Sequence, residues 1–154
     1  LQDLSIDLLT IHASGGPEMC HYAAQARNDT NPRLKLLAVT VLTSMNQSQL
    51  KQLNIQQSVQ KQVVDLAQLS SQSGVDGVVS SPLELELLRA NLDPSSLIVT
   101  PGIRPLNSDQ NEQKRVMTPR EASEKGADFI VVGRPILKSP NPKKTVQEII
   151  NSIS

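Results

Sequence analysis

A glycine and an arginine follow an apolar run near the end of the sequence, in IVVGRPI at residues 130–136. Glycine has no side chain, so an anion can approach the backbone N–H of Gly133 closely. Arg134 supplies a planar guanidinium whose N–H groups match two phosphate oxygens at once. The alternative interpretation is a turn glycine followed by a surface arginine. The first interpretation predicts a phosphate-binding site.

A second arginine occurs in a similar setting one apolar run earlier, in TPGIRP at residues 100–105. Here Gly102 and Arg104 also follow an apolar stretch closely. Two such tips are harder to explain as unrelated surface turns than one tip alone. Together they favour phosphate binding over the alternative.

The other apolar runs are also followed by small, hydroxyl-bearing or cationic residues. The segments that follow the five runs are His12–Gly16, Thr43–Met45, Ser80–Ser81, Thr100–Pro105 and Gly133–Pro135. Proteins built on parallel strands bind their ligands at the carboxyl ends of those strands. We therefore expect these segments to surround one shared opening.

Other kinds of catalytic centre are not predicted. The two histidines have no cysteine or carboxylate at ligand spacing, so we expect no metal site and interpret His12 as a hydrogen-bonded strand end. Ser44 and Ser81 have no paired His–Asp arrangement, which argues against a serine nucleophile. Cys20 is interpreted as a small buried residue.

The elements that position these residues alternate between strand and helix. The apolar runs are nearly continuous, which is typical of parallel strands covered by helices. We predict strands at residues 7–12, 35–42, 75–81, 96–102 and 128–133. We predict helices at residues 15–29, 46–53, 58–74, 82–92, 118–126 and 141–154. The alternation indicates a single α/β domain, either an open doubly wound sheet or a (β/α)8 barrel.

Individual residues mark the ends of these elements. Thr118 is a predicted helix N-cap, and Gly74 and Gly126 are predicted helix stops. Asp7 and Asp128 precede strands and are interpreted as solvated strand starts.

Composition narrows the classes of function. Lys plus Arg and Asp plus Glu number 15 each, so the net charge is zero, and aromatic residues make up 1% of the 154 residues. A chain without a basic surface or aromatic platforms is not expected to bind nucleic acid. Glycine-rich dinucleotide and P-loop motifs are absent from the sequence. No run approaches the roughly 18 to 20 apolar residues of a membrane span, no signal peptide is visible, and the single cysteine fits the cytoplasm.

Six segments, in this order and spacing, resemble the C-terminal part of bacterial orotidine 5′-phosphate decarboxylase: TIHASGGPEM, LLAVTVLTSM, GVDGVVSS, VTPGIRP, EQKRVMTPREA and GADFIVVGRPI. The resemblance covers essentially the whole chain. It implies a TIM (β/α)8 barrel that forms a homodimer. It also implies a lyase that converts orotidine 5′-monophosphate (OMP) to UMP and CO2 in pyrimidine biosynthesis, without cofactor or metal.

The resemblance assigns base-side roles to three residues. Thr43 and Ser44, in LTSM, would meet the edge of the pyrimidine. Pro101, in TPGIRP, would line the pyrimidine pocket.

The resemblance assigns phosphate-side roles to four residues. Arg104 would lie in the loop on the phosphate side, and Gln113 would reach over the phosphate. The N–H of Gly133 and the fork of Arg134 would hold the phosphate itself. The family usually has Asp before that glutamine, and this chain has Glu112, which keeps the charge.

The family's catalytic motif is absent from this sequence. The family carries D-x-K-x-x-D on its third strand, with a further Asp and Lys on the first two strands, and no D-x-K-x-x-D occurs among the 154 residues. We therefore expect residues 1–154 to form an N-terminally truncated, partial barrel that holds only the family's fourth to eighth strands. No catalytic residue is predicted in the chain, and the chain alone is expected to be inactive.

Two alternative functions stay open at this stage. One alternative is a half barrel that binds a nucleotide phosphate without catalysing a reaction. The other is a different phosphate-binding barrel enzyme, such as an epimerase or a hexulose-phosphate synthase. LTSM together with TPGIRP argues against the latter group. Because a partial barrel leaves two bare strand edges, self-association of the chain is also expected.

Overall fold

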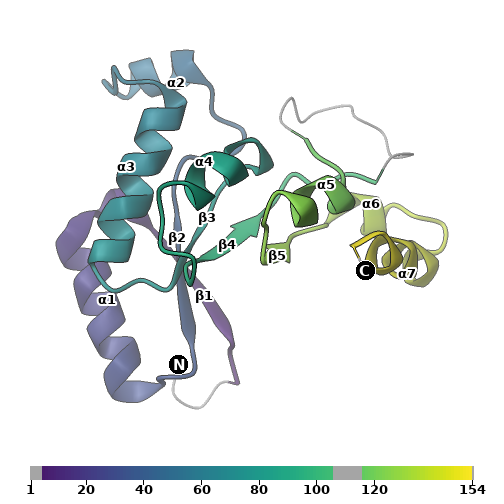
Figure 1. Ribbon diagram of the computed structural model, residues 1–154, viewed down its shortest axis with the longest axis horizontal. Coiled ribbons are helices and arrows are strands. Elements are labelled where there is room, and N and C mark those ends of the chain that lie inside the picture. The colour runs from purple at the N-terminus through teal and green to yellow at the C-terminus, as the bar shows by residue number, and fades with distance from the viewer. Residues whose placement is uncertain (1–4, 106–115, 154) are drawn as a thin grey trace.

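The protein is described from a computed structural model that covers residues 5–105 and 116–153. Five parallel strands form one sheet in the order β1-β2-β3-β4-β5 (Figure 1). The strands are β1 (Leu8–His12), β2 (Lys35–Val39), β3 (Gly77–Val79), β4 (Leu97–Thr100) and β5 (Phe129–Ile130). Every neighbouring pair is parallel, as the apolar runs predict.

The strand order decides between the two predicted architectures. In a doubly wound sheet the strand order reverses at a switch point, whereas a barrel adds each strand beside the previous one. Here sequence order and spatial order are the same across the described sheet. The topology is therefore that of consecutive units of a barrel.

Helices connect all of these strands. The α-helices are α1 (Gly16–Thr30), α2 (Gln47–Gln52), α3 (Val59–Gln72), α4 (Leu85–Arg89), α5 (Pro119–Glu124), α6 (Arg134–Leu137) and α7 (Pro142–Ile153). Two 3-10 turns, η1 (Ala13–Gly15) and η2 (Pro82–Glu84), precede α1 and α4. The helix predicted at 82–92 is thus a 3-10 turn followed by a short α-helix. The sequence interpretation missed α6.

Local signals explain several helix ends. The side chain of Thr118 accepts from the backbone N–H of Glu121, and Glu121 reaches back to the N–H of Thr118, which makes a capping box. Gly74 and Gly126 have φ of +87° and +92°, a conformation that glycine adopts without strain. The predicted cap and both predicted stops are therefore confirmed.

β1 ends at His12 as predicted, and the other four strands end earlier than predicted. The last strand, predicted at 128–133, is observed only at Phe129–Ile130. Val131 still donates to the carbonyl of Thr100 at 2.9 Å. Beyond that bond, Gly102 has φ +83°, which is not a strand conformation, and Ile103 and Arg104 pair with Met117 instead.

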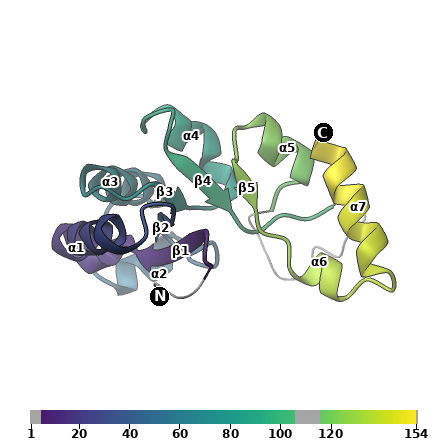
Figure 2. The same ribbon diagram turned by 90° about the horizontal axis from the view of Figure 1, so that it is seen from below.

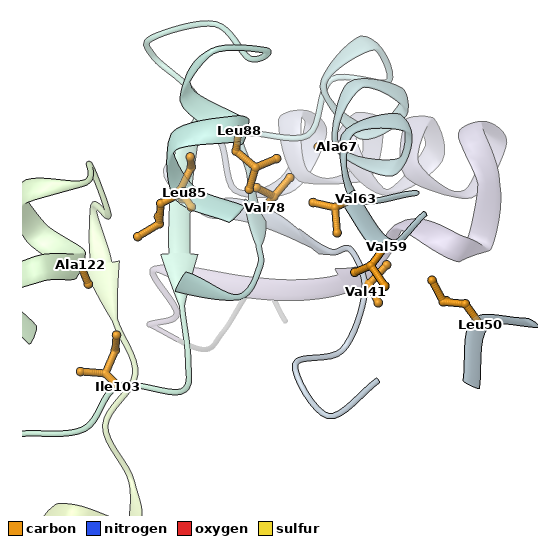
Figure 3. Packing of buried hydrophobic residues seen from close by; sticks show 11 residues of the cluster. Val41, Leu50, Val59, Val63, Ala67, Val78, Leu85, Leu88, Ile103 and Ala122 are labelled. Carbon is orange, nitrogen blue, oxygen red and sulfur yellow. The ribbon is translucent and has the colours of Figure 1, made fainter. Parts of the chain in front are cut away.

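The core lies between the sheet and the helices. A cluster of buried residues extends from Val41 and Leu50 at one end to Ile103 and Ala122 at the other (Figure 3). A second cluster joins α1 to β2 through Cys20, Ala24 and other small residues, so Cys20 is buried as expected. On this sheet α3 lies between α1 and α4 and contacts both of them.

The carboxyl-terminal part forms a lobe at one end of this core and joins it through Ala122 of α5. It contains β5 with α5, α6 and α7, and lies away from α1 and α3 (Figures 1 and 2). Phe129 and Val131 are 46% and 52% exposed, and α6 buries none of its residues. The lobe that carries Gly133 and Arg134 is therefore packed less densely than β2, β3 and β4.

Candidate functional site

The first predicted residues lie in the turn that follows β2. Thr43 is half-buried there and Ser44 is exposed, between the end of β2 and the start of α2. The following helix is fixed by Asn46, whose side chain accepts from the N–H of Gln49 at 3.1 Å. The amide oxygen of Gln49 accepts in return from the N–H of Asn46 at 2.9 Å. The turn is thus held at both ends by regular structure.

Pro101 and Arg104 lie in the segment that follows β4. Its backbone is tied to the segment before α5, since the N–H of Arg104 donates to the carbonyl of Met117 at 2.9 Å. Ile103 is fully buried in the core cluster, and its carbonyl accepts from Nη1 of Arg104 at 2.8 Å. Core packing therefore anchors this loop, and Arg104 itself is half-buried.

The guanidinium group of Arg134 lies close enough to Arg104 for its charge to act on it. Burial, and then the positive charge of Arg134, lower the pKa of Arg104 from its usual value. Like charges held near each other disfavour the charged state, and a nearby anion relieves that cost. The structure thus brings together the two arginines that the sequence places after β4 and β5.

Gly133 stands immediately before α6 with an exposed backbone. Its φ is −103°, outside the left-handed region, and a Cβ built at this position meets no heavy atom within 4 Å. Neither a positive φ nor a crowded neighbour therefore calls for glycine here. The open space beside the backbone is compatible with the predicted close approach of an anion.

The predicted residues do not form one tight cluster. The turn with Thr43 and Ser44 follows β2, and Gly133 with Arg134 follows β5, three strand spacings away in the sheet. Neighbouring strands lie about 4.8 Å apart, so the two ends are separated by roughly 14 Å along a flat sheet and by less across a curved one. An extended molecule, rather than a small ion, fits such a separation. Gln113 lies outside the described residues.

Ser80, Ser81 and Thr100, expected at the shared opening, are buried instead, and Ser80 and Thr100 form a polar layer with Thr40 that sequence reasoning missed. Thr40, Ser80 and Thr100 stand at the ends of β2, β3 and β4 and are 6%, 1% and 0% exposed. Each is a hydroxyl residue directly after an apolar run, in AVT, VVS and IVT, and that repeated position was the available signal.

Sequence reasoning also missed a pair of matching ion pairs at the amino ends of the strands. The carboxylate of Asp76, just before β3, accepts from the N–H of Leu36 at 2.9 Å, and it pairs with Arg27 of α1 and with Lys35 at 3.1 Å. Arg27 also donates to the carbonyl of Gly74 at 3.2 Å. We call this set the first clasp.

The second clasp repeats this arrangement one βαβα step later. Asp128 accepts from the N–H of Ile98 at 2.6 Å and pairs with Arg89 at 2.5 Å. Arg89 also donates to the carbonyls of Gly126 and Ser96 at 2.7 Å. Interpreting Asp128 as a solvated strand start was therefore incomplete, because the exposed residue joins two strands. The Gly-x-Asp spacing in GVDGVV and GADFIVV was the signal for both clasps.

Other features of the described residues lie elsewhere. A cavity of about 240 Å³, lined mainly by apolar side chains such as Leu9, Ile11 and Ala23, lies between β1 and α1, away from the loops above. The described residues contain no group of three or more His, Cys, Asp or Glu side chains placed to hold a metal ion. None of the helices in the described ranges has the length and apolar character needed to cross a membrane.

Comparisons with known proteins agree with the resemblance. A family model described as "Orotidine 5'-phosphate decarboxylase / HUMPS family" matches residues 1–149. The orotidine 5'-phosphate decarboxylase of Trichlorobacter lovleyi is 48% identical over 153 residues, and the match covers 97% of this chain and 64% of that protein. The protein of the same name from Staphylococcus saprophyticus is 46% identical over 153 residues, covering 99% of this chain and 66% of that protein.

A solved structure gives the same result for the fold. The crystal structure of orotidine 5'-phosphate decarboxylase from Lactobacillus acidophilus matches with a TM-score of 0.86 and 37% identity, and the match covers 99% of this chain and 66% of that chain. The predicted class, an α/β fold of the TIM-barrel type, is confirmed. The chain spans about two thirds of the length of the relatives it matches.

Proposed function

The chain belongs to the orotidine 5'-phosphate decarboxylase / HUMPS family, and from this we propose that the loops after β2, β4 and β5 bind a pyrimidine nucleotide such as OMP or UMP. In this proposal Gly133 and Arg134 hold the phosphate, with Arg104 beside them. Thr43, Ser44 and Pro101 meet the base. Gln113 is proposed to reach over the phosphate.

One observation carries the proposal most directly. Two arginines from separate loops lie close enough that, after burial, the charge of Arg134 also lowers the pKa of Arg104, and Arg134 directly follows an open glycine backbone at Gly133. Preorganised cations beside an exposed N–H suit a phosphate dianion, which accepts charge-assisted and bidentate hydrogen bonds. The relatives named orotidine 5'-phosphate decarboxylase favour a nucleotide over the sugar phosphates of other barrels.

The proposed reaction of the whole protein is the decarboxylation of OMP to UMP and CO2. Loss of CO2 leaves a carbanion on the pyrimidine, and preorganised charge at that atom is the largest expected catalytic contribution. The residues proposed above bind and orient the nucleotide but include no lysine that would protonate the carbanion. We therefore propose that these 154 residues alone bind the nucleotide without decarboxylating it.

The test is a titration and an assay on the same sample. UMP binding is measured by calorimetry, and OMP turnover is followed by loss of the orotate absorbance. Saturable UMP binding without turnover is the expected result. Absence of UMP binding by folded chain would reject the binding role, and turnover above a heat-denatured control would reject the proposed division of binding and catalysis.

Two further properties belong to the proposal. Exposed apolar side chains at both sheet edges, Leu8 at 36%, Phe129 at 46% and Val131 at 52%, support self-association of the chain, and the family resemblance supports a homodimer. A nucleotide-converting step of pyrimidine synthesis supports a cytoplasmic location.

A further inference from the structure

Three buried hydroxyl groups stand side by side at the carboxyl ends of the three central strands. Thr40 directly follows β2, Ser80 directly follows β3, and Thr100 is the last residue of β4. All three are at most 6% exposed. Buried hydroxyls are retained at low cost only when they are hydrogen-bonded, so their partners matter.

Hydrogen bonds connect the three groups across the strands. Oγ1 of Thr40 donates to the carbonyl of Val79 at 3.1 Å and to Oγ of Ser80 at 3.2 Å. Oγ1 of Thr100 donates to the carbonyl of Ser80 at 2.8 Å. Ser80 is therefore the shared partner, joined to β2 on one side and to β4 on the other.

A buried carboxylate lies next to this layer. Glu84, the last residue of η2, is 3% exposed, and its Oε2 lies 3.5 Å from Oγ of Ser80. The hydroxyl of Ser80 donates to this carboxylate oxygen, so Glu84 joins the layer through Ser80.

The layer lies behind the proposed binding loops rather than in them. Along each strand, side chains alternate between faces, so Thr40, Ser80 and Thr100 share the face of Ala38, Val78 and Ile98. Those three residues pack in the core clusters beneath the helices. The hydroxyls therefore act on a ligand through the backbone, since they do not face it.

Each outer hydroxyl sits just before a proposed ligand-binding loop. Thr40 precedes the turn that holds Thr43 and Ser44, and Thr100 precedes Pro101 and the loop of Arg104. We propose that Thr40, Ser80 and Thr100 are positioning residues that fix the base-side turn and the phosphate-side loop relative to each other. This inference rests on the proposed nucleotide function.

Two isosteric substitutions test the two outer hydroxyl groups of the layer one at a time. Thr40→Val removes only the donor that anchors the base-side turn. Thr100→Val removes only the donor that anchors the loop of Pro101 and Arg104. Ser70→Ala is the matched control, because Ser70 is a fully buried serine whose hydroxyl donates to Leu66 at 2.8 Å within α3, far from the loops.

The readout is binding of UMP, uridine and ribose 5-phosphate, measured by NMR titration of the full 154-residue chain. Thr40→Val should weaken the binding of UMP and uridine about five- to tenfold and leave the binding of ribose 5-phosphate unchanged. Thr100→Val should weaken all three ligands by a similar factor, because its loop contributes to both sides. Ser70→Ala should change none of them.

Equal losses for all three ligands in Thr40→Val, or no loss in either variant, would overturn the positioning role while leaving UMP binding by the parent intact. Failure of the parent to bind UMP would instead reject the proposed function.

Amide exchange provides a second test that needs no ligand. Thr40→Val should speed exchange at residues 41–45 and Thr100→Val at residues 102–104, each without affecting the other segment. Uniformly faster exchange along the chain would mean general destabilisation and would contradict local anchoring.

Discussion

The two ends of the sheet use arginine in opposite ways. At the amino ends, Arg27 and Arg89 each pair with a carboxylate that also accepts a strand N–H. At the carboxyl ends, burial and then the charge of Arg134 lower the pKa of Arg104. Arg27 and Arg89 thus join structural elements through a carboxylate, whereas Arg104 and Arg134 are proposed to bind a ligand anion.

This contrast separates stability from binding along one polypeptide. The clasps connect neighbouring strands at their first residues, whereas the loops at the opposite ends leave open space beside Gly133. Substitutions in the clasps should therefore change the free energy of unfolding, and substitutions in the loops should change affinity.

The largest effect is expected from Arg134→Ala at the carboxyl ends. Loss of a charge-assisted contact to a phosphate should cost about 2 to 5 kcal/mol of UMP binding free energy. The free energy of unfolding should change little. Calorimetric titration measures the first quantity and urea unfolding the second. Arg120→Ala is the control, since Arg120 is an exposed arginine of α5 that pairs with Glu124, and the variant should bind UMP as the parent does.

The next largest effect is expected from Asp76→Ala in the first clasp. Arg27 and Asp76 side chains are only 10% and 16% exposed, and the substitution also leaves the N–H of Leu36 without its acceptor. The free energy of unfolding should fall by about 1.5 to 3 kcal/mol, measured by urea denaturation. Asp29→Ala, at an exposed carboxylate of α1, should stay within about 0.5 kcal/mol of the parent. A comparable loss in both variants would refute the clasp.

The same clasp predicts an acid dependence of stability. Burial raises the pKa of Asp76. The hydrogen bond from the N–H of Leu36 and the charges of Lys35 and Arg27 together lower the pKa by more than burial raises it, so the net pKa lies below its usual value. A carboxyl group with a depressed folded-state pKa stabilises fully above its unfolded pKa, near 3.9, and loses that contribution as pH falls through the folded value. Urea midpoints of the parent should therefore drop below about pH 4 more steeply than those of Asp76→Asn.

Alanine substitutions at Gly126 and Gly133, which lie on either side of β5, should distinguish an effect on stability from an effect on binding. Gly126 has φ +92°, and a Cβ there would lie 3.1 Å from Nε of Arg89, so Gly126→Ala should cost about 1 to 2 kcal/mol of stability. Gly133→Ala should lose less stability but bind UMP more weakly, because its methyl group would occupy the open space beside the backbone. Unchanged UMP affinity in Gly133→Ala would argue against close approach of the phosphate.

The smallest effect is expected in the second clasp. Arg89 and Asp128 side chains are 25% and 35% exposed, more than those of the first clasp. Solvent screens the pair more strongly, so Asp128→Ala should cost about 0.5 to 1.5 kcal/mol of unfolding free energy in the same urea experiment. A loss of stability larger than that of Asp76→Ala would contradict the expectation that the more buried clasp contributes more.

Sequence patterns predicted the elements better than the contacts between them. Apolar runs and the signals at Thr118, Gly74 and Gly126 depend on neighbouring residues, so they placed the strands and helix ends. The clasps join residues such as Arg27 and Asp76 that are distant in sequence, and only the folded sheet brings them together. The neighbour of β5 ends at Thr100 and is followed by Gly102 with φ +83°, and no local pattern at 128–133 contains this information.

The site was predictable in the same partial way. The end of each apolar run located the loops, and the resemblance supplied roles for Thr43 and Ser44. The proximity of Arg104 and Arg134 required the structure, because it depends on how the loops after β4 and β5 fold.

The central claim is that the carboxyl-end arginines bind the phosphate of a nucleotide. It is tested most directly by the ratio of the dissociation constants for uridine and UMP, compared between the parent and Arg134→Ala. UMP should bind the parent much more tightly than uridine, and the ratio should fall about 30-fold or more in Arg134→Ala, the equivalent of about 2 kcal/mol. An unchanged ratio in a folded Arg134→Ala variant would contradict the claim.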